Sequence, residues 1–89
     1  MKIVFLRQPY KFIKRADKNL KEKIKEEVLK IQKKPFDGYR LKGISLREFF
    51  CHHFVFIRVN YRIVYKIAGN LIIVTIATRE NFYKDLRVI

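Results

Sequence analysis

Four side chains in the second half of the chain have the chemistry to act on a phosphodiester. Arg62 and Arg79 interrupt two neighbouring runs that are otherwise almost wholly apolar. A guanidinium keeps its charge and is costly to bury unpaired, so each arginine is expected to face an open surface that receives an anion. His53 and Tyr83 are the groups that could take or return a proton.

These residue types suit metal-free cleavage of RNA, in which the neighbouring 2′-hydroxyl attacks the phosphate. The two arginines would hold the phosphate and stabilise the extra negative charge of the transition state. Because an arginine cannot act as the base, that role goes to His53 or to Tyr83. Three further cations are predicted to contact RNA around this centre, namely Lys66, Arg58 and Arg47.

Each candidate also has a structural interpretation, which the sequence leaves open. Arg62 and Arg79 could form ion pairs or line a rim. Tyr83 could cap or pack, and His53 could be an ordinary exposed strand residue. The neighbouring His52 is expected at the core side of the same strand or at its edge.

Several classes of chemistry find no support in the sequence. There is no P-loop, dinucleotide fingerprint, zinc pattern or arrangement of paired carboxylates. Cys51 and His53 could share one face of a strand, but no second Cys/His pair exists to complete a metal site. A single cysteine rules out an internal disulfide and agrees with a reducing compartment. No metal and no cofactor are expected.

The charge balance predicts an anionic partner. Lysine and arginine number 21 against 8 acidic residues, which gives a formal net charge of +13. Nucleic acid, an acidic protein segment and an anionic membrane surface would all satisfy such a charge. No apolar run approaches the roughly 18 residues that a membrane helix needs, and the first residues lack the apolar core of a secretion signal. A cytoplasmic protein without a membrane partner is therefore expected.

The first half of the chain reads as a strand followed by a helical hairpin. A length of 89 residues predicts one domain, spanning residues 1–89. Residues 2–7 predict a strand, and Pro9 suits the start of a helix over Tyr10–Ala16. Asp17 is expected to cap a second helix that Pro35 stops. Its apolar residues recur at helical spacing: Leu20, Ile24, Val28 and Ile31.

The second half reads as strands, because β-branched and aromatic residues dominate it. The strands are expected at Ser45–Ile57, Tyr61–Ile67 and Leu71–Ala77. Turns are expected at Arg58-Val59 or the neighbouring pair, and at Gly69-Asn70. The predicted fold class is α+β: an N-terminal strand, a two-helix hairpin, a three-stranded antiparallel meander completing a four-stranded sheet, and a short C-terminal helix at Asn81–Leu86.

Alternation along the strands assigns the two faces of the sheet, if Ile57 lies opposite Asn60 across the hairpin. One face is dense in aromatic residues and is expected to pack beneath the helices: Phe54, Phe56, Tyr61, Ile63, Tyr65 and Ile67. The other face mixes apolar residues with cations and is expected to stay open for a partner: His53, Val55, Ile57, Arg62, Val64 and Lys66.

This layout and several motifs resemble the RelE/ParE superfamily of bacterial and archaeal type II toxins over nearly the whole chain. The resemblance rests on KKP at Lys33–Pro35, LKG at Leu41–Gly43, YRIVY at Tyr61–Tyr65 and ATRENFYKDL at Ala77–Leu86. It implies two helices packed on one face of an antiparallel sheet, with the other face concave and functional.

The resemblance also implies roles for particular residues. Ribosome-dependent members cut mRNA in the decoding site with arginines in the positions of Arg62 and Arg79, as phosphate holder and transition-state stabiliser. They place a tyrosine where Tyr83 stands, for stacking or proton transfer. On the preceding strand they carry lysines, where this chain has His53 and Val55. His53 could replace one lysine as a base, whereas Val55 cannot.

Three functions follow as hypotheses. The first is a ribosome-dependent mRNA endoribonuclease that inhibits translation, with the ribosome, mRNA and an acidic antitoxin as partners. The second is a poison of DNA gyrase. The absent lysines favour it, because the resemblance implies that members close to ParE poison gyrase and lack the full set of cleavage residues. The third is a non-catalytic module that binds RNA or an antitoxin. The antitoxin is expected to cover Val55, Ile57 and Val64 and to pair with Arg62 and Lys66.

Overall fold

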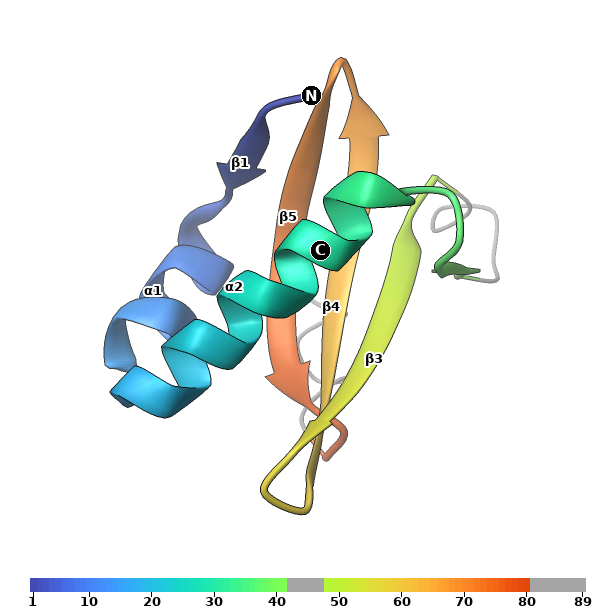
Figure 1. The fold of residues 1–89 in the computed structure, drawn as a ribbon. Helices are drawn as coiled ribbons and strands as arrows, with labels where there is room; N and C mark the ends of the chain where they lie inside the picture. Colours follow the sequence, from blue (N-terminus) through green and yellow to red (C-terminus); the bar gives the residue numbers. More distant parts are fainter. Residues whose placement is uncertain (42–47, 81–89) are drawn as a thin grey trace.

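The computed structural model, which describes residues 1–41 and 48–80, places two helices against one face of a twisted sheet (Figure 1). The strands lie in the order β1-β5-β4-β3-β2. We call the face of the sheet opposite the helices the far face. The elements are β1 (Ile3–Phe5), α1 (Arg7–Arg15), α2 (Lys18–Lys33), β2 (Tyr39–Arg40), β3 (Phe50–Phe56), β4 (Val59–Ala68) and β5 (Asn70–Thr78).

The sheet is larger than predicted and is mixed. β1 runs parallel to β5, whereas the other neighbours pair antiparallel. The predicted four-stranded sheet is therefore wrong, since the described residues form five strands. The missed strand, β2, has two residues, which is too short for an alternating pattern to show in the sequence. The predicted C-terminal helix at Asn81–Leu86 lies outside the described residues.

A glutamine side chain extends the short N-terminal strand. β1 ends at Phe5, but the Gln8 side chain accepts a hydrogen bond from the Ile76 N–H and donates one to the Ile76 carbonyl, each at 2.8 Å. The amide thus bonds β5 as a strand backbone would. The helix α1 begins at Arg7, three residues before the predicted start. Pro9 is tolerated there because first-turn N–H groups have no acceptor within the helix.

The second helix forms as its sequence predicts. The Asp17 side chain accepts a hydrogen bond of 2.8 Å from the Leu20 N–H, which caps α2. The helix ends at Lys33, ahead of Pro35. Its buried apolar stripe packs on the face of the sheet that the helices cover. Together they form the main core, which includes Ile24, Val28, Ile31, Phe50, Phe54, Ile63, Tyr65, Leu71, Ile73 and Ile76.

The β3–β4 hairpin turns at Ile57 and Arg58, whose φ angles are 47° and 63°. Phe56 therefore pairs with Val59, and His53 with Arg62. The expected pairing of Ile57 with Asn60 is wrong by two residues. Because side chains alternate with a period of two, a shift of two leaves both predicted faces unchanged. Gly69, at φ 72°, turns the chain between β4 and β5.

The far face is only partly open, which corrects the prediction for Val64. That side chain is fully buried in a second apolar cluster with Phe49, Cys51 and Val74. The cluster covers the middle of β4, a central strand buried on both faces. Val55 remains exposed nearer the hairpin. In the part of the chain that the structure describes, no helix is long and apolar enough to cross a membrane.

Candidate functional site

Three of the predicted site residues meet at one depression on the far face, near the β3–β4 hairpin. His53 of β3 lies directly opposite Arg62 of β4. Just past β5, the Arg79 N–H donates a hydrogen bond of 2.9 Å to the Asn60 carbonyl, which keeps this backbone beside β4. His53, Arg62 and Arg79 line a depression of about 220 Å³, together with Phe54, Val55, Asn60 and Tyr61.

The electrostatics of the depression favour a neutral imidazole. Partial burial lowers the pKa of His53, and the positive charge of Arg62 and the neighbouring His52 lower it further. The ring is therefore uncharged at neutral pH and can accept a proton. Burial raises the pKa of the adjacent Cys51 thiol to about 11 in spite of Arg62, so it stays protonated and unreactive.

The other predicted cations are not gathered at this depression. Lys66 lies four residues further along β4, about 13 Å away at ordinary strand spacing. Its Nζ is 5.9 Å from the centroid of the Phe49 ring. Arg58 is exposed at the hairpin turn. Arg47 and Tyr83 lie outside the described residues, so their predicted roles stay predictions.

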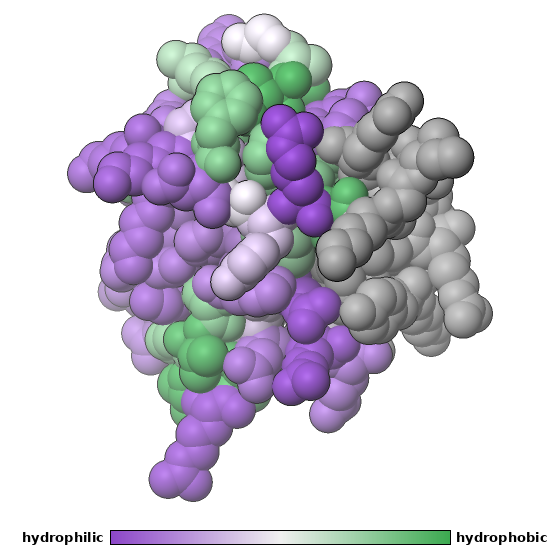
Figure 2. Space-filling view, turned by 90° about the vertical axis from the view of Figure 1, so that its right-hand side faces the viewer, coloured by the Kyte–Doolittle hydropathy of each residue, from purple (hydrophilic) through white to green (hydrophobic). Residues whose placement is uncertain are grey.

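The surface around the hairpin combines charge with exposed apolar groups. The exposed apolar side chains are Val55, Ile57 and Val59. Figure 2 shows a predominantly hydrophilic surface, with a hydrophobic patch near its lower end, where Figure 1 places this hairpin. Within residues 1–41 and 48–80, no three His, Cys, Asp or Glu side chains are grouped closely enough to hold a metal ion.

Comparison with known proteins identifies the family. Residues 3–87 match the family described as ParE-like toxin of type II bacterial toxin-antitoxin system. The chain belongs to this family. It is therefore a type II toxin of the RelE/ParE superfamily, as its motifs predicted. No curated protein matches the sequence at a significant level.

Two solved structures share the fold of the toxin. One is the isolated E. coli RelE toxin, with 14% identity, a TM-score of 0.68 and coverage of 99% of this chain and 98% of that chain. The other is the intact E. coli RelBE toxin-antitoxin complex, with 13% identity, the same TM-score of 0.68 and coverage of 85% of this chain and 93% of that chain. At such identities the likeness shows the fold alone.

A buried carboxylate that the sequence analysis missed ties the helices of the toxin to its sheet. Glu27 of α2 is 4% exposed. Its Oε1 lies 2.8 Å from His52 Nε2, and its Oε2 lies 2.9 Å from Lys30 Nζ and 3.1 Å from Lys23 Nζ. Burial alone would raise the pKa of Glu27, but these hydrogen bonds and charges outweigh it and lower the pKa to about 2. Its position in the buried stripe of α2, three residues after Ile24, was the available signal.

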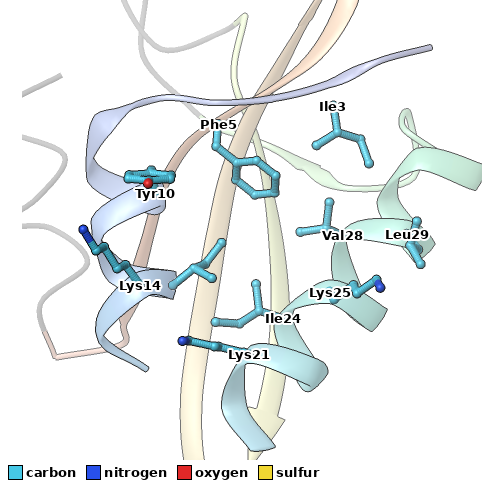
Figure 3. A pocket seen from close by; sticks show the side chains of 10 residues that line it. Ile3, Phe5, Tyr10, Lys14, Lys21, Ile24, Lys25, Val28 and Leu29 are labelled. Atoms are coloured by element: carbon cyan, nitrogen blue, oxygen red, sulfur yellow. The ribbon is translucent and has the colours of Figure 1, made fainter. Parts of the chain in front are cut away.

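The toxin has a second hollow, an apolar groove between β1, α1 and α2. It measures about 610 Å³ and is lined by Ile3, Phe5, Tyr10, Ile13, Lys14, Lys21, Ile24, Lys25, Val28 and Leu29. Figure 3 shows Phe5 on the β1 side of the groove, across from Ile24 and Val28 of α2, with lysines on the helical side. Phe5, Tyr10 and Leu29 are substantially exposed. An apolar floor with a cationic rim is a surface suited to an amphipathic acidic partner.

Proposed function

We propose that the toxin cleaves mRNA on the ribosome by metal-free chemistry. The observation that carries this proposal is the shared depression of His53, Arg62 and Arg79. Two guanidinium groups and a neutral imidazole supply charge stabilisation and a base for such cleavage, and RNA carries its own nucleophile. The site lies on a strongly basic protein, with a net charge of +13, which favours approach to the RNA backbone.

In the proposed reaction, His53 takes the proton of the 2′-hydroxyl as its oxygen bonds to phosphorus. The bond from phosphorus to the 5′-oxygen breaks, leaving a 2′,3′-cyclic phosphate and a 5′-hydroxyl. Arg62 and Arg79 stabilise the added negative charge on the phosphate oxygens in the transition state. The departing 5′-oxygen must receive a proton, and Tyr83 is the residue to which the family resemblance gives that role.

The test is cleavage of an mRNA positioned on purified ribosomes, mapped by primer extension. Arg62→Ala should slow cleavage by about 100-fold to 1,000-fold, the usual cost of losing one transition-state donor. Arg15→Ala is the matched control, because it removes an equal charge from an exposed position on α1. Its rate should stay within about twofold. Equal losses in the two variants would contradict a catalytic role for Arg62.

A gyrase poison is the second candidate, and Val55 is the observation that favours it. This residue lines the depression where the RNA-cleaving relatives carry a lysine, and it offers no ionisable group. Gyrase-dependent DNA breaks with intact mRNA would establish this alternative and overturn the first. Harmless expression with neither effect would indicate a non-catalytic module.

The proposed partner of the toxin is an acidic antitoxin with an amphipathic segment that fills the helix groove. This placement differs from the predicted one on the far face, where Val64 is buried and unavailable. In the groove, apolar partner residues would cover Phe5 and Leu29, and flanking carboxylates would pair with Lys21 and Lys25. An amphipathic acidic helix has both features on one face.

Calorimetry with an acidic peptide designed to form an amphipathic helix would test this placement. Leu29→Glu puts a charge into the groove and should weaken binding at least tenfold, because the carboxylate must be desolvated. Val55→Glu makes the same change on the far face, where the residue is also exposed, and should change affinity less than threefold. A loss confined to Val55→Glu would place the partner on the far face.

A further inference from the structure

An exposed tyrosine stacks on the candidate base. Tyr39 of β2 pairs with Cys51 of β3, so its side chain lies on the far face, diagonally next to His53. The two ring centroids are 5.4 Å apart and the ring planes are inclined by 30°. The Tyr39 side chain is 71% exposed. An aromatic residue so open to water contributes little to the core, and its contact with His53 therefore calls for another explanation.

We propose that Tyr39 is a positioning residue, which holds the His53 imidazole over the depression shared with Arg62 and Arg79. The inference rests on the proposed function, since orientation of the ring matters only if His53 transfers a proton. No local pattern in the sequence indicates this role for Tyr39, because the residue lies in a connector outside every predicted strand. The two-residue strand β2 brings it to the site.

The His53 imidazole needs a positioning residue because a histidine side chain at the rim of a depression is free to rotate. An exposed histidine can rotate about χ1, and only some rotamers direct the ring toward a bound phosphate. A stacked aromatic neighbour favours one of them. The same ring also excludes water from one side of the imidazole, and such partial burial is the main cause that lowers the pKa of His53.

The other groups around His53 either also favour its neutral form or have no effect on its charge. Arg62 lies directly across on β4, and its charge disfavours a charged imidazole. Arg79 also lines the depression. Cys51, two residues earlier on the same face, is buried and neutral. His52 points to the helices, where Glu27 holds it. None of these groups can replace the flat surface that Tyr39 provides.

NMR titration of the two histidines in the intact toxin tests the contact itself. In Tyr39→Ala the titration midpoint of His53 should rise toward 6.5, because the ring becomes hydrated. Tyr39→Phe keeps the stack and should leave the midpoint unchanged. Phe36→Ala is the matched control, since Phe36 is an equally exposed aromatic residue, at 67%, that contacts Phe50 instead. His52, on the opposite face, should give the same signals in every variant.

Ribosome-dependent cleavage tests the consequence. Tyr39→Ala should lower kcat by about threefold to tenfold, the fold-change that corresponds to one lost aromatic pair. KM should change less than twofold, and the acid limb of the pH profile should move with the His53 midpoint. Tyr39→Leu, which keeps bulk without a ring, should behave as Tyr39→Ala and guards against a local loss of β2.

The outcomes separate this inference from the proposed function. An unchanged His53 midpoint in Tyr39→Ala would overturn the inference even in an active ribonuclease. A shifted midpoint with unchanged kcat would also overturn it, since the stack would then position nothing of consequence. If the wild-type toxin cleaves no mRNA, the proposed function fails, while the titration still decides whether Tyr39 controls the His53 ring.

Discussion

The two faces of β3 put neighbouring histidines into opposite surroundings. His52 faces the helices and lies 2.8 Å from the buried Glu27 carboxylate. His53 faces away, opposite the Arg62 guanidinium. One ring thus has an anionic partner inside the fold, and the other has a cationic neighbour at the surface. Because both residues are histidines, the charge of the neighbouring group and the access of solvent are what distinguish the structural His52 from the candidate base His53.

The largest expected effect is at His53. His53→Gln should lower the rate of ribosome-dependent cleavage by about 100-fold to 10,000-fold, the usual contribution of a general base. The free energy of unfolding of the His53→Gln variant, measured by urea denaturation, should differ from that of the wild type by less than about 0.5 kcal/mol, because the side chain is exposed. His52→Gln is the matched control on the other face, and it should keep cleavage within about threefold. Similar losses of cleavage activity in His53→Gln and His52→Gln would contradict the assignment of a catalytic role to His53 alone.

The next effect is on stability, at Glu27. Glu27→Gln removes the charge that accepts hydrogen bonds from His52, Lys30 and Lys23, and should cost about 2 to 3 kcal/mol of unfolding free energy. Glu26→Gln, one residue earlier with a side chain that is 58% exposed, should cost less than about 0.5 kcal/mol. Urea denaturation near pH 7 compares the two. Equal costs would show that the buried cluster adds no more than a surface ion pair.

Acid should weaken the helix-facing side selectively. The pKa of Glu27 falls from 4.5 to about 2 on folding. The stabilisation is therefore complete above pH 4.5 and is lost as the pH falls toward 2, by an amount on the order of 3 kcal/mol. Unfolding free energies measured between pH 2 and 6 should show this slope in the wild type. Glu27→Gln should flatten it, and an unflattened slope would assign acid sensitivity to other carboxylates.

The smallest effect is expected where β3 ends, at the hairpin turn. Ile57 has a φ of 47°, in the left-handed region that a β-branched residue adopts only at a cost. Ile57→Asn should raise the unfolding free energy by about 0.5 to 1 kcal/mol, since asparagine suits this type of turn. Val59→Asn, an exposed neighbour within the strand, should give no gain. Thermal denaturation measures both, and destabilisation by Ile57→Asn would indicate that the Ile57 side chain makes contacts worth more than the strain.

The sequence by itself determined the two helices, the β3–β4–β5 meander, the faces of its strands and the family. The spacing of Ile24, Val28 and Ile31 fixed the buried side of α2, because a helix repeats every 3.6 residues. Period-two alternation put His53 and Arg62 on one face in spite of the misjudged register. The motifs around Arg62 and Arg79 identified the superfamily, which the family match confirms.

Tertiary structure alone decided which distant residues meet. The pairing of Tyr39 with Cys51, of Glu27 with His52 and of Gln8 with β5 joins segments that no local pattern connects. The burial of Val64 depends likewise on side chains brought from other strands. Local sequence carries periodicity and turn chemistry, whereas contact between remote segments is set by the packing of the whole chain, and so are the burial and pKa of each charged group.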